Sequence, residues 1–456
     1  MSAKNSSEAR DRIIEKLGDI VEKNDRIDPE LYKKYNVKRG LRDIDGTGVL
    51  VGLTEIGDVR AYIFDEEEKV PTEGRLLYRG MEINDIVRGF QEEKRFGFEE
   101  CCYLLLFGEL PDRTGLAEFE KLLGELRGLP DGFLEDMILK APSRDIMNKL
   151  ARSVLAAYSY DPNPDDLSLK NTLRQCIELI ARFPTMVAYG YQAKAHYHDE
   201  KSLFIHSPRE NLSTAGNLLH MLRPDSSYTA SEAELLDLAL VLHAEHGGGN
   251  NSTFVAHVVT STGTDTYSAI AAAIGSLKGP QHGGANIKVM GMMEEIKNNV
   301  ADWDDDDEIS AYLTKIIKKE AFDRTGLIYG VGHAVYTVSD PRTILLKQKA
   351  EALAGEKGLE KEFKLYNNVE RLAPGVFFKE KNNDKVMCAN VDFYSGFVYK
   401  TLNIPMELYT PIFAVGRIAG WCAHRIEELV NGGRIIRPAY KSVIGKRDYL
   451  PMSERG

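Results

Sequence analysis

Residues 279–286 read GPQHGGAN and place one histidine among three glycines, just after an apolar, helix-like segment. Glycine lets the backbone turn sharply and approach a ligand closely, because it has no Cβ. Histidine is the side chain whose unperturbed pKa lies nearest neutrality. Residues 330–342 (GVGHAVYTVSDPR) and 390–396 (NVDFYSG) combine glycine with an acid–base residue in the same way. Together the three stretches predict proton-transfer chemistry on a small anionic molecule.

Each stretch offers one acid–base side chain: His282, His333 and Asp392. Asp392 has apolar neighbours, and burial among them would raise its pKa and make it a competent base. The alternative role, an N-cap for the following helix, fits the sequence equally well. Arg342 follows Pro341, which favours the first turn of a helix. There its guanidinium group could bind a carboxylate, although a surface arginine is the plainer interpretation.

Two further histidines lie three residues apart in the sequence LHAEHGGGN, residues 242–250. This spacing differs from the His-Glu-x-x-His pattern that places two zinc ligands on one helix face. A zinc hydrolase built on His243 and His246 would also lack a convincing third ligand. We interpret His246, beside the glycines, as a ligand-contacting donor and His243 as structural.

Two arginines near the C-terminus are candidates for binding an anion. Arg417 interrupts the apolar segment 411–421, where a buried charge needs a partner. A bound carboxylate or an internal acid would satisfy it. Arg437 precedes Pro438 in a basic tail, and from the residues alone a solvated tail is the better interpretation.

The composition excludes several classes of protein. The 456 residues are 43% hydrophobic and 28% charged, with a net charge of -11, which argues against nucleic-acid and anionic-membrane surfaces. Five cysteines without a Cys-x-x-Cys pair favour free thiols in a reducing compartment. The N-terminus lacks an apolar signal core, and no apolar run reaches about 18 residues. These features predict a cytoplasmic enzyme.

Most of the chain shows helical periodicity, and a β-rich patch punctuated by glycines occupies about residues 47–79. The acidic cluster 302–308 is typical of a solvated loop or a helix start. The clearest predicted helices span residues 8–23, 232–243, 266–277, 287–298 and 411–430.

Taken in order, these motifs resemble the citrate synthase family, including its 2-methylcitrate synthase relatives. The resemblance covers roughly residues 40 to 450. It implies a mainly α, two-domain helical fold with a short β-rich patch near the N-terminus. Residues 1–284 and 404–456 would form the large domain, and residues 285–403 a small mobile domain that closes over the substrates. It also implies a homodimer, with helix 266–277 in the interface.

The resemblance implies a role for each acid–base residue. Asp392 would take a proton from the methyl group of acetyl-CoA, while His282 hydrogen-bonds the thioester oxygen as enolate character develops. His333 would polarise the oxaloacetate carbonyl and protonate the new alkoxide. Water would then cleave citryl-CoA to citrate and CoA.

Substrate binding follows from the same resemblance, with no metal and no cofactor beyond acetyl-CoA as a substrate. The residues implied for oxaloacetate are His246, Arg342, Arg417 and, from the partner subunit, Arg437. The residues implied for CoA are Leu327, Gly330, Val331 and Gly332.

Two departures from the family pattern leave the acyl donor open. Gln281 stands where many relatives carry leucine, and residues 247–249 are richer in glycine than in bacterial relatives. A 2-methylcitrate synthase using propionyl-CoA is therefore the nearest alternative. A non-catalytic acyl-CoA-binding homologue is less favoured, because His282, His333 and Asp392 are all present.

Overall fold

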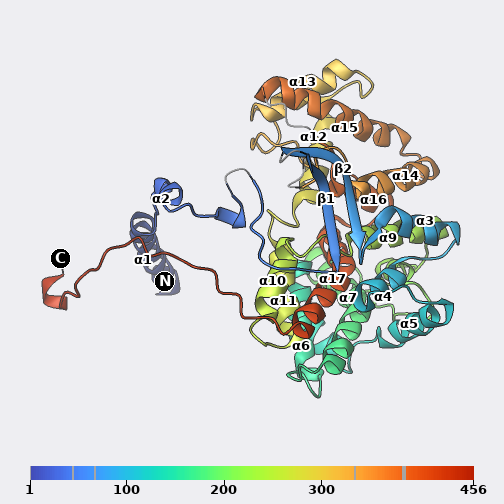
Figure 1. Ribbon diagram of the computed structural model, residues 1–456, viewed down its shortest axis with the longest axis horizontal. Coiled ribbons are helices and arrows are strands. Elements are labelled where there is room, and N and C mark those ends of the chain that lie inside the picture. Colours follow the sequence, from blue (N-terminus) through green and yellow to red (C-terminus); the bar gives the residue numbers. More distant parts are fainter. Residues whose placement is uncertain (1, 44–45, 66–67, 333–334, 383–386, 456) are drawn as a thin grey trace. The chain divides into compact units, whose positions relative to one another are not determined.

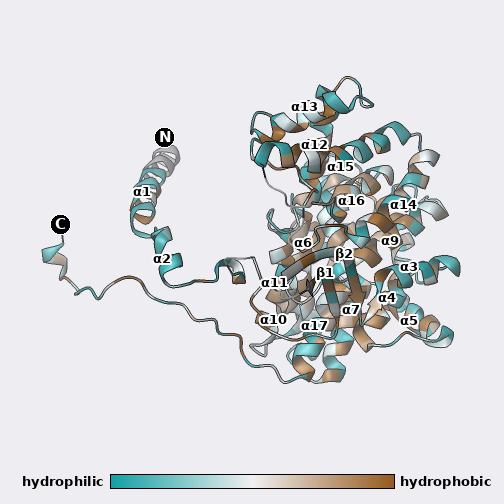
Figure 2. Ribbon diagram, turned by 45° about the horizontal axis from the view of Figure 1, so that its top comes forward, coloured by the Kyte–Doolittle hydropathy of each residue, from teal (hydrophilic) through white to brown (hydrophobic). Residues whose placement is uncertain are grey.

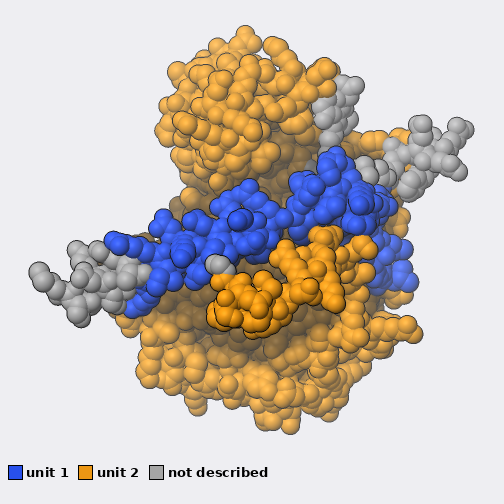
Figure 3. Space-filling model, turned by 90° about the vertical axis from the view of Figure 1, so that its left-hand side faces the viewer, with its two compact units in different colours: residues 1–53 blue, residues 54–456 orange. Residues whose placement is uncertain are grey.

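A computed structural model describes residues 2–43, 46–65, 68–332, 335–382 and 387–455 (Figure 1). The chain divides into two compact units, residues 1–53 and residues 54–456, coloured separately in Figure 3. Helices make up most of the described structure, and a small antiparallel sheet belongs to the second unit. The predicted mainly helical fold with a short β-rich patch is confirmed.

The first unit contains helices α1 (Ser2–Asn24) and α2 (Pro29–Lys34). A short 3-10 turn at Arg39–Leu41 follows. The helix predicted at residues 8–23 is therefore confirmed as part of α1. The prediction that residues 47–53 belong to the β-rich patch is wrong. Their only described pairing is one isolated bridge at Gly48.

The sheet consists of β1 (Gly57–Asp65), β2 (Glu68–Tyr78) and β3 (Met81–Glu82), in the order β1-β2-β3 with antiparallel pairing. Gly74 on β2 lies against a loop of the site, since a Cβ there would come within 2.1 Å of the Ser339 carbonyl oxygen. The sheet therefore covers the segment that leads into Arg342.

The second unit is otherwise built from helices joined by turns and loops. The helices predicted at 232–243, 266–277, 287–298 and 411–430 are confirmed. The helices are α3 (Ile83–Glu92), α4 (Phe98–Phe107), α5 (Arg113–Leu126), α6 (Ile146–Ala157), α7 (Leu169–Asp199), α8 (Thr214–Leu222), α9 (Ala230–His243), α10 (Asn251–Thr260), α11 (Thr266–Lys278), α12 (Ala285–Asn299), α13 (Asp306–Ile317), α14 (Pro341–Glu356), α15 (Glu360–Lys381), α16 (Val391–Thr401) and α17 (Tyr409–Val430), with short π- and 3-10 turns at Leu134–Leu139, Tyr158–Tyr160, Met406–Leu408 and Met452–Glu454.

Helix α17 is the centre of the core and packs against α4, α7, α9, α10 and α11. Figure 2 shows that apolar residues are denser on α7, α9 and α17 than on the outer helices α3 and α13. Two glycines of α17 allow α9 to come very close. A Cβ on Gly416 would lie 2.9 Å from the Leu240 carbonyl oxygen, and one on Gly420 would lie 2.4 Å from that of Ala244. The end of α9 is thereby held beside the middle of α17.

Helices α12 to α16 pack on one another, α13 against α15 and both α12 and α14 against α16. In Figure 1 α12, α13 and α15 gather at one end of this unit, away from α5 and α6. Helices α14 and α16 both contact α9. Helix α9 is therefore where the two groups of helices meet.

None of the described helices is long and apolar enough to cross a lipid bilayer. All five cysteines are free thiols. The acidic cluster starts helix α13, as one of its two interpretations predicted, with Asp305 as the N-cap.

Candidate active site

His282 lies in a tight turn between α11 and α12. Its backbone N–H donates to the Gly279 carbonyl oxygen at 2.9 Å. Gly283 has no room for a side chain, because a Cβ would lie 2.2 Å from the Leu277 carbonyl oxygen. The glycines of this motif therefore serve a close turn that fixes the histidine at the start of α12.

The His282 ring is held in one tautomer by the first turn of α10. The backbone N–H of Ser252 donates to Nε2 of His282 at 3.3 Å, and the Ser252 Oγ lies 3.0 Å from the same nitrogen. Since Nε2 accepts, the ring proton sits on Nδ1. Burial and the nearby Arg417 lower the pKa of His282 to about 4. At neutral pH the ring is an uncharged imidazole with one N–H donor.

Asp392 occupies the first turn of α16, and the N-cap of that helix is Asn390, whose side chain accepts from the Asp392 N–H at 3.0 Å. The alternative in which Asp392 itself caps the helix is therefore wrong. Burial, reinforced by Asp340, raises the pKa of Asp392 to about 6, and the charges of Arg342 and Arg417 oppose this rise. No hydrogen bond to its carboxylate is present among the described residues. The group is thus a base poised near neutral pH.

Residues 330–332 pair with the chain just before Asp392. The Gly332 N–H donates to the Cys388 carbonyl oxygen at 2.8 Å, and the Asn390 N–H donates to that of Gly330 at 2.9 Å. Both glycines have a positive φ, 77° and 93°, which favours glycine. This pairing brings the segment that leads into residue 333 beside the first turn of α16. His333 itself lies outside the described residues.

Arg342 stands in the first turn of α14, where Pro341 is the first helical residue and Asp340 the N-cap. The predicted helix start is confirmed, and the surface alternative is wrong because the side chain is buried. Asp340 accepts from Nε at 3.0 Å and from Nη2 at 2.7 Å. It also accepts from the Val391 N–H at 3.3 Å. One carboxylate therefore orients the arginine and joins α14 to α16.

Arg417 is fully buried in the middle of α17. Its Nε donates to the His243 carbonyl oxygen at 2.7 Å. Its Nη1 and Nη2 have no hydrogen-bond partner among the described residues. Burial lowers the pKa of Arg417 to about 10, a shift that the carboxylate of Glu245 partly offsets. The sequence left two possible partners for this guanidinium group, a bound carboxylate or an internal acid. Among the described residues, no acidic side chain is hydrogen-bonded to it.

The two histidines near the end of α9 differ. His243 lies in the last turn, is fully buried, and places Nε2 3.1 Å from the Tyr399 hydroxyl. His246 follows the helix end and meets the ring of Tyr336 edge-on, with ring centroids 5.6 Å apart. This agrees with a structural His243. Among the described residues, neither histidine belongs to a group of three side chains arranged to hold a metal ion.

Four of the candidate residues share one electrostatic neighbourhood: His282, Asp392, Arg342 and Arg417. The charge of Arg417 acts on the pKa of both His282 and Asp392, and Arg342 acts on Asp392 and on Arg417. Two other candidates are exposed: Arg437 in the C-terminal tail, and Leu327, which is 54% exposed in a loop. Nothing in the single chain brings Arg437 to the other residues.

Sequence reasoning missed several residues that build this site. Ser252 sets the His282 tautomer, Asp340 holds Arg342, and Asn286 donates to the Ser395 hydroxyl and so ties α12 to α16. The Asp-Pro-Arg sequence could have indicated Asp340 as an N-cap, because aspartate before a proline at N1 is a helix-start signal. The sequence offers no comparable signal for Ser252.

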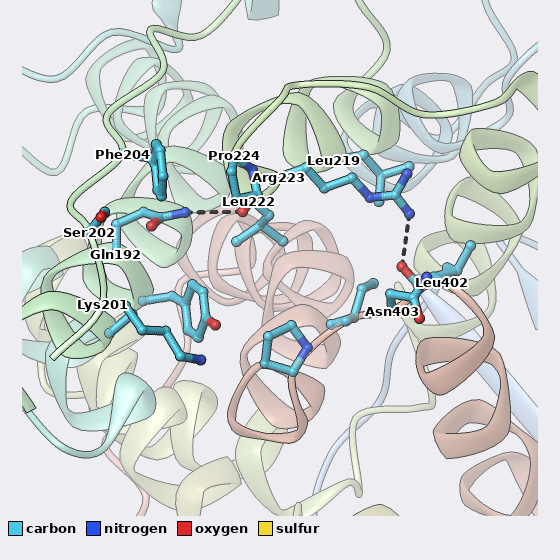
Figure 4. Close-up of a pocket in the computed structure, with 14 residues that line it drawn as sticks. Gln192, Lys201, Ser202, Phe204, Leu219, Leu222, Arg223, Pro224, Leu402 and Asn403 are labelled. Carbon is cyan, nitrogen blue, oxygen red and sulfur yellow. Dashed lines mark hydrogen bonds between the residues drawn. The ribbon is translucent and has the colours of Figure 1, made fainter. Parts of the chain in front are cut away.

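A separate cavity of about 230 Å³ lies between α7, α8 and the turn after α16 (Figure 4). Gln192 donates to the Leu222 carbonyl oxygen at 3.0 Å, and Arg223 donates to that of Leu402 at 2.8 Å. None of the candidate site residues lines this cavity, so it is a feature of the scaffold near residue 403 rather than part of the site.

Comparison with known proteins gives one consistent family. The family model described as citrate synthase, C-terminal domain, matches residues 44–439. A citrate synthase of Deinococcus radiodurans is 36% identical over 390 residues, covering 84% of this chain and 94% of the relative. A 2-methylcitrate synthase of Shewanella oneidensis is 32% identical, covering 83% and 92%.

Solved structures agree with the sequence relatives. A citrate synthase of the archaeon Thermoplasma acidophilum, in a ternary complex with carboxymethyl coenzyme A and oxaloacetate, has a TM-score of 0.73 at 25% identity. The match covers 92% of this chain and 99% of that structure.

Proposed function

Because this chain belongs to the citrate synthase family, we propose that it condenses acetyl-CoA with oxaloacetate and water to give citrate and CoA. One observation carries the proposal. The buried guanidinium of Arg417 has two nitrogens without a partner among the described residues, and it lies within the electrostatic reach of Asp392 and His282. A dicarboxylate substrate would supply the missing acceptors.

Asp392 is the proposed base that removes a proton from the acetyl-CoA methyl group. Its pKa of about 6 leaves it mostly ionised at neutral pH, yet more basic than an exposed aspartate. His282 is the proposed donor to the thioester oxygen. A neutral imidazole that carries its proton on Nδ1 can stabilise the developing enolate without a net charge. The lowered pKa of His282 supports this role.

Oxaloacetate is proposed to bind through His246, Arg342 and Arg417. Asp340 occupies only Nε and one hydrogen of Nη2 on Arg342. The outer edge of this guanidinium, including Nη1, can therefore still receive a carboxylate. His333 is proposed to polarise the oxaloacetate carbonyl and to protonate the alkoxide. This assignment rests on the family likeness alone.

CoA is proposed to run along residues 327–332. At Gly332 only Met387 lies near the place of a Cβ, at 3.6 Å, so the backbone there stays open, whereas Gly330 makes room for Phe393 and Val289. The exposed Leu327 offers an apolar contact. Residues 285–403 are proposed to close as a small domain over residues 1–284 and 404–456, which the packing of α12 to α16 on one another supports. No metal or additional cofactor takes part in the proposed chemistry.

A homodimer is proposed in which Arg437 completes the partner subunit's site, with α11 at the interface. The exposure of Arg437 in a tail supports this arrangement. Heterodimers of an Arg437→Ala chain and an Asp392→Asn chain test it, because one of their two sites would have both residues. We expect activity near half that of the wild-type dimer. Verified heterodimers with no activity above the parent variants would refute a shared site.

The cytoplasm is the proposed location, which the five free thiols support. The acyl donor has one serious alternative, propionyl-CoA, because relatives include a 2-methylcitrate synthase. A thiol-release assay with oxaloacetate decides between them. We expect a higher kcat/KM with acetyl-CoA than with propionyl-CoA. The reverse order would identify a 2-methylcitrate synthase, and no release with either donor would indicate a non-catalytic homologue.

A further inference from the structure

Outside the site described above, two histidine rings face each other between α10 and α17. Nε2 of His257 lies 3.1 Å from Nδ1 of His424. The nearest oxygen of Glu427, Oε2, is 3.7 Å from the same Nδ1, too far for a hydrogen bond. These three ligand atoms all lie within 4.8 Å of one another.

The outer nitrogen of each ring is held by a carboxylate. Nδ1 of His257 lies 2.8 Å from Glu428, and Nε2 of His424 lies 3.0 Å from Glu245. A carboxylate can only accept, so both outer nitrogens donate and carry protons. The two facing nitrogens then present lone pairs to each other, unless one additional proton or a cation lies between them.

Histidine–carboxylate pairs of this kind orient the ligands of many metal sites, because the carboxylate fixes the ring tautomer and increases its basicity. Glu427 is oriented in a similar way, since its Oε1 accepts from the Glu55 N–H at 2.7 Å. Its Oε2 is buried and has no hydrogen-bond partner among the described residues. Two nitrogens and one oxygen are therefore presented to a common point.

We propose that His257, His424 and Glu427 form a binding site for one divalent transition-metal ion of the Zn²⁺ type. Two imidazoles and one carboxylate suit Zn²⁺ and leave a fourth position for water. Ligand atoms around a tetrahedral Zn²⁺ are about 3.3 Å apart, given bonds of about 2.0–2.1 Å. Two of the observed separations are 3.1 Å and 3.7 Å, and no pair exceeds 4.8 Å, so ion binding requires the Glu427 carboxylate to move towards His257.

The surroundings favour a cation. Three carboxylates, those of Glu245, Glu427 and Glu428, lie around the two rings. Gly248 borders the cluster, since a Cβ there would lie 3.5 Å from His424 and 3.7 Å from His257. The glycine-rich segment 247–249 is therefore next to this cluster. His257 and Glu427 are 14% and 12% exposed, which gives the ion a route from solvent.

The site would connect to the proposed substrate site through Glu245, which immediately precedes His246. The Glu245 carboxylate accepts hydrogen bonds from Nε2 of His424 and from the Gly247 N–H. A bound ion would therefore fix α10, α17 and the segment that carries His246 to one another. Its role is structural, and the proposed condensation does not depend on it.

Metal binding by full-length protein without a polyhistidine tag tests the proposal. The protein is dialysed against a chelator, then titrated with Zn²⁺ by calorimetry and with Co²⁺ by visible absorption. We expect one ion per chain with a submicromolar dissociation constant, intense Co²⁺ bands typical of four or five ligands, and a higher Tm with Zn²⁺.

Matched variants assign the ligands. His257→Gln and Glu427→Gln should each weaken Zn²⁺ binding at least about 100-fold, and Glu428→Gln at least about tenfold, since outer partners contribute that much. His220→Gln is the control: His220 faces His206 with ring centroids 5.7 Å apart, and its loss should leave binding unchanged. Circular dichroism verifies that each variant is folded. The Co²⁺ spectrum of the wild-type protein tests the site even if a variant does not fold.

The proposal is overturned if the folded wild-type protein binds no Zn²⁺ more tightly than about 100 μM, since the facing nitrogens would then hold only a proton. It is also overturned if both ligand variants bind as tightly as wild type, or if His220→Gln abolishes binding. In the last two cases the ion would sit on other histidines.

Discussion

The start of α14 and the middle of α17 each bury an arginine, and the two are stabilised in opposite ways. Arg342 is held by Asp340 through two side-chain hydrogen bonds, and this carboxylate keeps the pKa of Arg342 above its ordinary value. Arg417 has one bond to a carbonyl oxygen and two nitrogens without a partner among the described residues, and burial lowers its pKa to about 10.

This difference separates two uses of a buried charge. An ion pair completed inside the protein fixes geometry, and losing one of its partners is costly because the other charge stays buried. A charge that is not paired inside costs stability until a ligand of opposite sign arrives. Arg342 therefore positions the junction of α14 and α16, while Arg417 is the stronger candidate to gain its partner from the substrate.

The largest expected effect is on oxaloacetate binding by Arg417→Met. The variant removes two charge-assisted hydrogen bonds to the substrate, each worth about 1.5–3 kcal/mol, so the dissociation constant should rise about 10³-fold. The same change removes a buried charge that is only partly offset by Glu245, but it also removes the donor to the His243 carbonyl oxygen, so the Tm of the substrate-free protein should change little. Calorimetric titration and thermal unfolding give both values. Wild-type affinity together with a lower Tm would reverse the comparison.

Arg342→Met should lower the stability of the substrate-free protein more than Arg417→Met does. It leaves the carboxylate of Asp340 buried without its partner, which costs about 3–5 kcal/mol of folding free energy. Chemical denaturation of the substrate-free protein measures this loss. The double variant Arg342→Met/Asp340→Asn is the control: it removes the unpaired charge but keeps a side-chain oxygen that can cap α14, so it should recover part of the stability. If Arg342→Met were as stable as Arg417→Met, the two arginines would not differ as described.

Asp392→Asn tests the carboxylate that both arginines influence. The folded-state pKa of about 6 lies above the ordinary value of 3.8, so the folded protein binds this proton more tightly than the unfolded chain. The ionised group therefore destabilises the substrate-free protein above about pH 6, and this cost disappears as the pH falls below about 4.

Asp392→Asn should accordingly raise the free energy of unfolding by up to about 3 kcal/mol at pH 7.5 and leave it unchanged at pH 4. Denaturation curves at the two pH values check this. An equal effect at both values would mean that the pKa of Asp392 is not raised in the folded protein.

The smallest expected effect concerns the orientation of His282. Ser252→Ala removes the hydroxyl that lies 3.0 Å from Nε2 but keeps the backbone N–H that donates to it. The tautomer should persist, and kcat should fall about fivefold with little change in the KM for oxaloacetate, because one orienting hydrogen bond is worth about 1 kcal/mol. A fall as large as that of His282→Ala would show that the hydroxyl, rather than the backbone, holds the ring.

Much of the fold could be predicted because helical periodicity is local. Residues 232–243, 266–277 and 411–430 carry their pattern in consecutive turns, and all are helical. The strand prediction for residues 47–53 was wrong because a pattern of apolar residues spaced by glycines does not show whether a neighbouring strand is available for pairing. In the structure β2 pairs with β1, which begins at Gly57, and with β3.

The candidate site could be predicted where an acid–base side chain and glycines occur in the same stretch of sequence, as with His282 and Asp392. It was not predictable where a residue acts through a distant segment. The carbonyl of His243 that receives Arg417 lies 174 residues away in sequence, and Gly416 and Gly420 that permit this approach look like ordinary helix residues. The His257–His424 pair joins positions 167 residues apart, so no local pattern could indicate it.

Proton removal by Asp392 is the central claim, and exchange of the acetyl-CoA methyl protons tests it most directly. Protein is incubated in D₂O with acetyl-CoA and malate, a four-carbon dicarboxylate that fills the arginine site but lacks a carbonyl to attack. We expect the wild-type protein to incorporate deuterium into the methyl group, and Asp392→Asn to do so about 10³-fold more slowly with unchanged malate affinity. Exchange at the wild-type rate in Asp392→Asn would contradict the account.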